Sequence, residues 1–296
     1  MHDNCKRINI KKTVYYIDEN DGDKIALHYI TNADSSNKKE MGAVVLCHGI
    51  TYSSLAVFDI PIEGFSFAER LAILGYDVFM PDYLGYGKSI FKKNVTVDTA
   101  SAFRDLDISI KFIKNMHRYN NLYLIGWSWG AQIAGKYAIE GEIRIDKLVL
   151  YGFKWHIDTK ALSAIKGDWR KNDSDHLKSD FAVPGTIVTE VLEEYIKRAL
   201  ELDPESPNGP RKELLKNNFF IEPGKIKAPT LIVHGHKDPG LDLIDSIEFF
   251  EKLNGVKFYS IIYGAHPIHL ESNYWQLIYT IWNFFECKTN TDMQSN

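Results

Sequence analysis

The stretch 122–137, LYLIGWSWGAQIAGKY, constrains the fold of this chain more than any other. An apolar run is followed at once by Gly126, Ser128 and Gly130 in the pattern GWSWG, and small residues then recur at helical spacing. This pattern predicts a buried strand, a very sharp turn and a helix. A sharp turn brings backbone segments close together, so small residues are needed two positions before and after its apex. A serine at the apex matches the nucleophile elbow, although a tight turn with an incidental serine has the same pattern.

The length, composition and net charge of the chain indicate a globular protein without a nucleic-acid or membrane partner. The 296 residues allow one large α/β domain or two ordinary ones, and the 45% hydrophobic and 25% charged fractions suit a globular chain. A net charge of −4 gives no reason to expect binding to nucleic acid or to anionic membranes. We see neither a secretory signal nor a run of about 18 apolar residues that could span a bilayer. With three widely spaced cysteines, Cys5, Cys47 and Cys287, we expect reduced thiols and a cytoplasmic location.

The order of apolar and polar runs predicts a mostly parallel sheet. A turn-forming cluster separates the β-like runs 13–17 and 24–30, which indicates an antiparallel hairpin. Strands and helices then alternate, as is typical of a parallel sheet with helices on both faces. The expected later strands are 43–47, 77–81, 122–125, 147–151, 230–234 and 257–262. In such sheets, binding sites form at the carboxyl ends of the strands.

The alternation breaks between residues 153 and 224, which we interpret as a cap inserted into the domain. The sequence therefore predicts a core made of residues 1–152 and 225–286, a cap over 153–224 and a disordered tail over 287–296.

Two further polar residues follow predicted strands and complement Ser128. Asp238 follows the strand 230–234, and His266 follows the strand 257–262. A serine hydroxyl needs a general base, which in turn needs an orienting carboxylate, and the order Ser, Asp, His is the one associated with the elbow motif. We therefore expect Ser128 as nucleophile, His266 as base and Asp238 as acid. Asp242 is the reserve candidate for the acid, and His269 is the rival for the base.

The negative charge that develops on the substrate needs preorganised hydrogen-bond donors. One should be the backbone N–H of Trp129, directly after the nucleophile. The second should come from the loop after the strand 43–47, from Ile50 or alternatively from Thr51. We expect His48 to stabilise loops and to take no part in proton transfer.

Taken together, these motifs resemble the α/β-hydrolase superfamily from about residue 13 to 286. The resemblance rests on CHG at 47–49, DYLGYGKS at 82–89, GWSWG at 126–130, HGHKD at 234–238 and GAHPIHLE at 264–271. It implies an eight-stranded, mostly parallel sheet with a largely helical cap inserted after the sixth strand, 147–151. It also implies the same roles for Ser128, Asp238 and His266. The bulky tryptophans on both sides of Ser128 depart from the usual pattern, so relatives are a poor guide to the substrate.

The sequence also predicts the kind of pocket and the absence of a metal. Aromatic residues in the expected cap and loops indicate a moderately sized apolar or aromatic substrate, with Trp127, Phe153, Trp155 and Tyr83 as candidate pocket residues. The pattern HxHxD at 234–238 is similar to a dinuclear metal motif, but Pro239 stands where that motif expects histidine. We expect no metal and no cofactor.

The predicted function is cleavage of a carboxylic ester, a thioester or a lactone through an acyl-enzyme on Ser128. The elbow serine argues against the dehalogenases and epoxide hydrolases of the superfamily, which carry aspartate there. One alternative is hydrolysis of a carbon–carbon bond in a diketone-like compound. Another is a ligand-binding or lyase-type protein of the same fold, with slow or no turnover. The expected partner is a small-molecule substrate, and the oligomeric state stays open.

Overall fold

An eight-stranded sheet forms the centre of the protein in the computed structural model, which describes residues 8–19, 22–34, 42–92, 97–117, 119–156, 165–214 and 221–288. The strand order is β1-β2-β4-β3-β5-β6-β9-β10. The strands are β1 (Ile10–Asp18), β2 (Lys24–Asn32), β3 (Ala43–Cys47), β4 (Asp77–Asp82), β5 (Leu122–Trp127), β6 (Lys147–Tyr151), β9 (Thr230–Gly235) and β10 (Lys257–Ile262).

Seven of these strands point in the same direction, and β2 alone runs against them. The pairs β1–β2 and β2–β4 are antiparallel, and every later pair is parallel. This arrangement confirms the predicted hairpin and the predicted mostly parallel sheet. In β3, Val44 and Leu46 pack into the core on one face of the sheet, while Val45 and Cys47 pack into the core on the other. A strand covered on both faces has no solvent side, which explains its uninterrupted apolar sequence.

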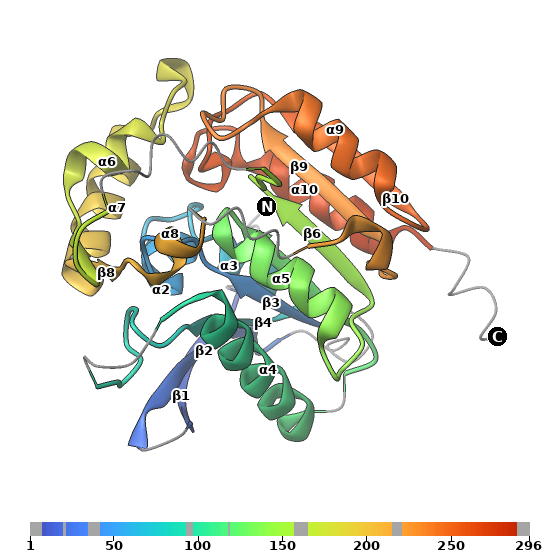
Figure 1. Cartoon of the computed structure of the whole chain (residues 1–296), viewed down its shortest axis with the longest axis horizontal. Helices are drawn as coiled ribbons and strands as arrows, with labels where there is room; N and C mark the ends of the chain where they lie inside the picture. The colour runs from blue at the N-terminus through green and yellow to red at the C-terminus, as the bar shows by residue number, and fades with distance from the viewer. Residues whose placement is uncertain are drawn as a thin grey trace, which may run out of the picture.

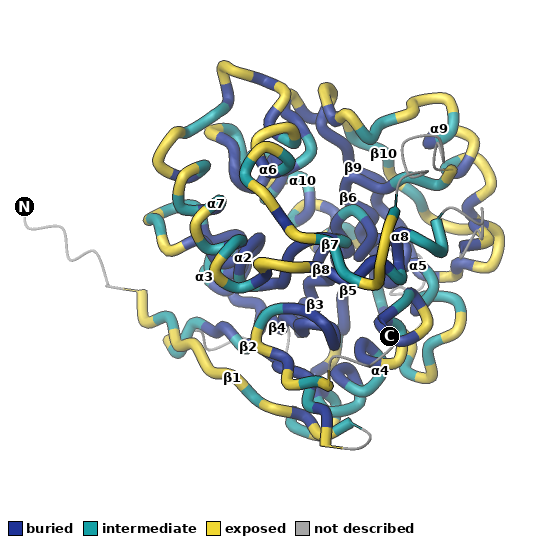
Figure 2. Tube along the Cα trace, turned by 60° about the vertical axis from the view of Figure 1, so that its left-hand side comes forward, coloured by how far each residue is buried: buried dark blue, intermediate teal, exposed yellow. Residues whose placement is uncertain are grey.

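Helices cover both faces of the sheet (Figure 1). One layer contains α4 (Thr99–Met116), α5 (Trp129–Glu140) and α9 (Leu243–Lys252). The other contains α2 (Ser54–Phe58), α3 (Phe67–Ile73) and α10 (Tyr274–Glu286). Figure 2 shows buried residues concentrated along the central strands, with exposed residues on the outer loops and helices. The rigid centre of the molecule therefore lies beneath the loops that leave the carboxyl ends of the strands.

The chain between β6 and β9 adds a smaller group of elements beside the sheet (Figure 1). They are β7 (Trp169–Lys171), α6 (Ser174–Ser179), α7 (Thr189–Leu202), β8 (Glu205–Pro207) and α8 (Gly209–Leu214), with 3-10 turns at Pro184–Thr186 and Pro223–Lys225. The strands β7 and β8 form an antiparallel pair of their own. We refer to residues 153–224 as the inserted segment; its boundaries stay a prediction. Most of the predicted tail over 287–296 lies outside the described residues.

Buried polar contacts fasten the inserted segment to the loops of the core. Asp203, at the end of α7, accepts hydrogen bonds from the N–H and hydroxyl of Ser53 at 2.8 and 2.7 Å and from the N–H of Gly87 at 2.7 Å. Further along, Arg211 donates to the hydroxyl of Thr51 at 2.8 Å. The loops after β3 and β4 are therefore held by the inserted segment as well as by the sheet.

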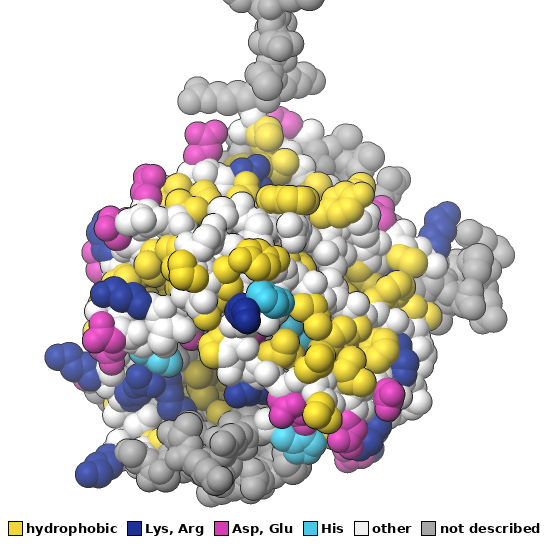
Figure 3. Space-filling view, turned by 90° about the horizontal axis from the view of Figure 1, so that it is seen from above, with side chains coloured by type: hydrophobic (Ala, Val, Ile, Leu, Met, Phe, Trp, Pro, Cys, Tyr) yellow, Lys and Arg dark blue, Asp and Glu magenta, His cyan; other side chains and the backbone are white. Residues whose placement is uncertain are grey.

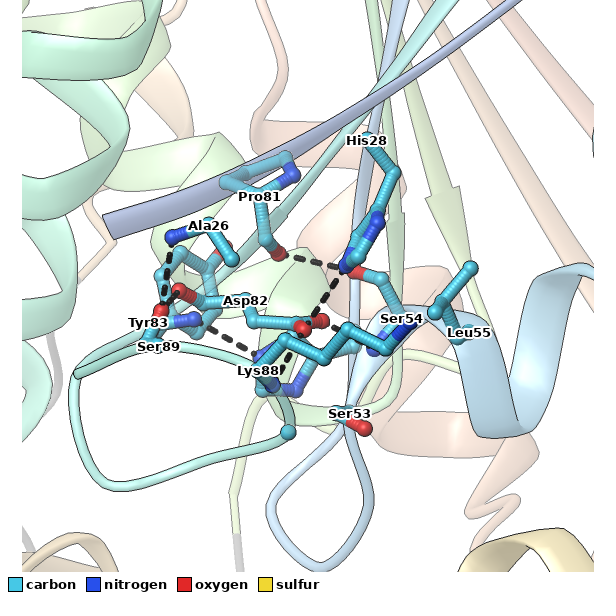
Figure 4. Close-up of polar contacts among 12 residues, drawn as sticks. Ala26, His28, Ser53, Ser54, Leu55, Pro81, Asp82, Tyr83, Lys88 and Ser89 are labelled. Atoms are coloured by element: carbon cyan, nitrogen blue, oxygen red, sulfur yellow. Dashed lines mark hydrogen bonds and ion pairs between the residues drawn. The ribbon is translucent and has the colours of Figure 1, made fainter. Parts of the chain in front are cut away.

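A second buried network, centred on Asp82, holds the loop after β4 (Figure 4). The carboxylate of Asp82 lies 2.8 Å from Nε2 of His28 and accepts hydrogen bonds from the N–H groups of Ser54 and Lys88, both at 2.9 Å. Burial by itself would raise the pKa of Asp82, but the charge and hydrogen bond of His28 lower it. An ionised Asp82 therefore ties together β2, α2 and the loop after β4.

We predict that Asp203→Ala lowers the free energy of unfolding by about 3 kcal/mol, because it leaves three buried donors without an acceptor. Urea denaturation measures the change. Glu201→Ala, at an exposed position of the same helix, is the control and should alter stability by less than about 0.5 kcal/mol. Equal stability of the two variants would contradict the anchoring role of Asp203.

Candidate functional site

The turn between β5 and α5 has the geometry that the GWSWG pattern predicts. Ser128 adopts φ 57° and ψ −123°, and it is the only non-glycine residue with positive φ in the described part of the chain. A Cβ on Gly126 would overlap the backbone of α5, and one on Gly130 would overlap the carbonyl oxygen of Cys47. Both positions therefore need glycine. Ser128 is partly exposed, whereas Trp127 and Trp129 beside it are buried.

The loops after β9 and β10 bring an acid and a base together. Nδ1 of His266 lies 2.8 Å from Oδ2 of Asp238, and the two side chains are 13% and 1% exposed. The other carboxylate oxygen of Asp238 accepts the N–H of Gly240 at 2.7 Å. Since a neutral imidazole that donates from Nδ1 keeps Nε2 as an acceptor, this pair presents a base whose orientation is fixed.

Contacts from three other parts of the chain hold His266 in place. Its carbonyl oxygen accepts the indole N–H of Trp127 at 3.2 Å and the hydroxyl of Tyr151 at 3.0 Å. Its N–H donates to the carbonyl oxygen of Asp180, in the inserted segment, at 3.4 Å. The backbone of Gly152 passes so close that a Cβ there would lie 2.9 Å from Cε1 of the imidazole. Strands β5 and β6 and the inserted segment therefore all position this histidine.

The charges around His266 favour its protonated form. Burial by itself would lower the pKa of His266, but the carboxylate and hydrogen bond of Asp238, helped by Asp180, raise it above the usual value. Burial would likewise raise the pKa of Asp238, yet His266 and the N–H of Gly240 lower it. The pair is therefore suited to accept a proton at Nε2 and to stabilise the resulting charge.

Ser128 and His266 line two adjoining cavities. The larger, of about 300 Å³, is also lined by Trp129, Gln132, Lys154 and Asp238. The smaller, of about 150 Å³, is lined by Gly49, Trp127, His176 and other residues. Ile50 and Asp180 border both. The molecule seen from above carries many apolar side chains on its surface, with acidic ones mostly at the rim (Figure 3).

Two backbone groups near Ser128 have the surroundings expected of oxyanion donors. Trp129 is the first residue of α5, where an N–H has no acceptor within the helix. The carbonyl of Gly49 lies 2.8 Å from Nδ1 of His48, so the N–H of Ile50, in the same trans peptide, points the opposite way. Nε2 of His48 accepts the N–H of Tyr83 at 3.2 Å. Burial lowers the pKa of His48 to about 4, so this histidine is neutral and orients the loop.

Of the four predicted pocket residues, only Trp127 lines either of these cavities. Tyr83 is fully buried, with its ring 4.5 Å from that of His48. Phe153 packs against Phe249 at 4.7 Å, and Trp155 packs against the same ring at 5.5 Å. All three pack with the core layer that contains α4, α5 and α9, and the sequence does not distinguish this placement from a place in the pocket.

The alternative candidates for the base, the acid and a metal ligand are not among the residues that line the cavities, whereas Thr51, the alternative oxyanion donor, lines the smaller one. His269 is buried with Nδ1 3.0 Å from the hydroxyl of Tyr151. Asp242 accepts the N–H groups of Ile244 and Asp245 at the start of α9. His234 contacts Ser246 at 3.0 Å. Among the described residues, no three or more His, Cys, Asp or Glu side chains are grouped as metal ligands.

Four polar residues that line the cavities are not among the residues predicted from the sequence: Gln132, Lys154, His176 and Asp180. Lys154 stands two residues after the glycine that follows β6, so its place at the carboxyl edge of the sheet could have been inferred from the sequence. His176 and Asp180 lie in and just after α6, and no motif marks them. No helix in the described ranges combines the length and apolar character that crossing a membrane requires.

Comparison with known proteins agrees with this architecture. The esterase from Exiguobacterium antarcticum is 20% identical, with a TM-score of 0.67 over 93% of this chain and 100% of that one. The thioesterase domain from the curacin biosynthetic pathway is 18% identical, with a TM-score of 0.62 over 92% and 99%. A meta-cleavage product hydrolase is 17% identical, with a TM-score of 0.66 over 94% and 98%. At these identities the likeness shows the fold alone.

The family of this chain follows from a match of its sequence to a family model. No curated protein matches the chain. A family model described as the alpha/beta hydrolase fold matches residues 42–193, slightly more than half of the chain. This protein therefore belongs to the α/β-hydrolase family.

Proposed function

We propose that the protein is a serine hydrolase that cleaves a carboxylic ester, a thioester or a lactone through an acyl-enzyme on Ser128. The observation that carries this proposal is the shared cavity. Ser128, in its strained conformation at the start of α5, lines the same space as the hydrogen-bonded pair His266 and Asp238. A nucleophile, a base and an orienting acid in one cavity are the requirements of acyl transfer.

In the proposed mechanism, Oγ of Ser128 attacks the substrate carbonyl while Nε2 of His266 takes its proton. The oxyanion then accepts the N–H groups of Trp129 and Ile50, and the imidazolium is stabilised by Asp238. His266 returns the proton to the leaving group, whose bond to the carbonyl carbon breaks. Water, deprotonated by the same histidine, then releases the acid from Ser128. Strain at Ser128 contributes by fixing the hydroxyl at the cavity before substrate arrives.

Identifying the type of bond that is cleaved requires a panel of substrates. Proteins with this fold include an esterase, a thioesterase and a meta-cleavage product hydrolase, and attack by serine on a carbonyl is compatible with each. Turnover of matched ester, thioester and diketone substrates separates hydrolysis at oxygen or sulfur from hydrolysis at carbon.

We predict that a fluorophosphonate forms one stoichiometric adduct with the wild type and none with Ser128→Ala, as measured by intact mass. The reagent phosphonylates a serine only where a base activates it. Ser179→Ala, at an exposed position of the inserted segment, is the control and should label fully. An adduct that survives in Ser128→Ala would refute the assignment of the nucleophile.

We also predict that Asp238→Asn lowers the pKa of His266 and reduces kcat by about 10⁴-fold. Because the Asp238 carboxylate raises the pKa of His266, removing its charge favours the neutral imidazole at lower pH. A histidine NMR titration measures the first effect and steady-state kinetics the second. Asp242→Asn changes an exposed acid nearby and should alter neither quantity. An unchanged pKa in Asp238→Asn would show that another group orients the base.

For the wild type, kcat/KM should rise with pH through the pKa of His266, because only the neutral imidazole can accept the serine proton. Since that pKa is raised, the acid limb should lie above the pH expected for an unperturbed histidine. A profile that is flat across this range would argue against His266 as the base.

A further inference from the structure

The larger cavity beside Ser128 contains a basic side chain that the proposed reaction does not use. Lys154 follows β6 by three residues and lines this cavity together with Gln132 and Gly240. Its side chain crosses toward the loop after β9, since a Cβ on Gly240 would lie 3.5 Å from Cε of Lys154. The ammonium is close enough to His266 to lower the pKa of that histidine, as burial also does. The carboxylates of Asp238 and Asp180 raise the same pKa.

Lys154 has no acidic partner within ion-pair distance in the described part of the chain. Other lysines differ: Lys12 contacts Asp59, and the buried Lys147 caps the carbonyl groups at the end of α10. A half-buried ammonium loses part of its hydration, and a hydrogen bond to an anion compensates for this loss. Two carboxylates of the described residues also line this cavity, Asp180 and Asp238, but neither lies within ion-pair distance of Lys154, and Asp238 already accepts hydrogen bonds from His266 and Gly240.

A hydrogen bond from Gln132 anchors the backbone of Lys154 at the cavity wall. The carbonyl oxygen of Lys154 accepts the side-chain N–H of Gln132 at 3.2 Å. Gln132 is 7% exposed, and its own carbonyl oxygen Oε1 has no hydrogen-bond partner. Because Oε1 can only accept a hydrogen bond, Lys154 is the group of this wall that could bind an anion.

The two cavities differ in charge, which decides where an anion would bind. Asp180 borders both cavities, whereas Lys154 borders only the larger. In the smaller cavity the basic candidate is His176, whose pKa is lowered by burial. An anionic group would face Asp180 in either cavity, but among the described residues only the larger cavity adds a permanent cation, Lys154, and its other carboxylate, Asp238, is paired with His266. The larger cavity, at about 300 Å³, has room for a short chain or one small ring.

We propose that Lys154 binds an anionic group of the substrate, so that the preferred substrates are esters or thioesters that carry a free carboxylate in addition to the bond that is cleaved. This inference rests on the proposed hydrolase function, because it assigns the larger cavity to the part of the substrate beyond the scissile carbonyl. Lys154 acts as a specificity-determining residue and takes no part in bond cleavage.

The test compares matched substrates with and without a carboxylate. For the acyl side these are 4-nitrophenyl hydrogen glutarate and 4-nitrophenyl pentanoate; for the alcohol side, 4-acetoxybenzoate and 4-methylphenyl acetate. In one of the two pairs, the ratio of kcat/KM for the anionic to the neutral substrate should fall by about tenfold or more in Lys154→Met. Turnover of the neutral substrate should stay within about threefold. The pair that responds identifies the side of the ester that the cavity holds.

Two controls make the result specific to this lysine. Lys154→Arg keeps the charge and should retain most of the preference. Lys237→Met removes a charge from an exposed position next to Asp238 and should leave the ratio within about twofold, because an exposed charge is screened by salt. Equal ratios for wild type and Lys154→Met in both substrate pairs would overturn the proposal.

A binding measurement separates failure of this inference from failure of the proposed function. Glutarate should raise the melting temperature of the wild type and of Ser128→Ala, but not that of Lys154→Met. If the wild type neither reacts with fluorophosphonate nor hydrolyses any ester, yet glutarate stabilises it through Lys154, the hydrolase proposal fails and the anion site stands. If the serine labels and neutral esters turn over, but neither the ratio nor the melting temperature depends on Lys154, only the anion site fails.

Discussion

The close contact between helix α5 and the ends of strands β3 and β5 is the constraint on which the site depends. Gly126 and Gly130 let the helix begin within van der Waals distance of the strands, since a side chain at either position would overlap backbone atoms. The chain can then reverse only if Ser128 takes a positive φ, a conformation that costs about 1–3 kcal/mol. Packing of α5 against the sheet compensates for this strain. The serine is therefore presented by the core of the protein and not by a flexible loop.

The position of His266 depends on a different principle, because its loop has no comparable turn. Several separate elements each contribute one contact: Trp127 from β5, Tyr151 from β6, Asp238 after β9 and Asp180 from the inserted segment. The carboxylate of Asp238 orients the imidazole ring, and the other three contacts hold the backbone of His266. The two halves of the site are thus held by different means, the serine by sterics and the histidine by converging hydrogen bonds.

The sequence predicts those features that repeat a local rule. Strands buried on both faces appear as apolar runs, and the elbow requires glycine at fixed positions, so the sheet and the conformation of Ser128 could be predicted. His176 and Asp180 could not, because contacts between distant segments place them at the cavities. Tyr83, Phe153 and Trp155 show a related limit. A large aromatic side chain suits a core and a pocket equally well, and only the packing of the whole layer decides between them.

The buried contacts that fasten the inserted segment also bear on how molecules enter and leave. Swinging α7 away would break the hydrogen bonds of Asp203 to Ser53 and Gly87. Separating Thr186 from Glu271 would remove one of the two hydrogen bonds that the buried Glu271 side chain accepts. Displacing the whole segment at every turnover would thus require breaking several desolvated contacts at once. For the proposed hydrolase, this means that the cavities beside Ser128 keep their lining from the inserted segment while substrate binds, so that the shape of the site is set before the substrate arrives.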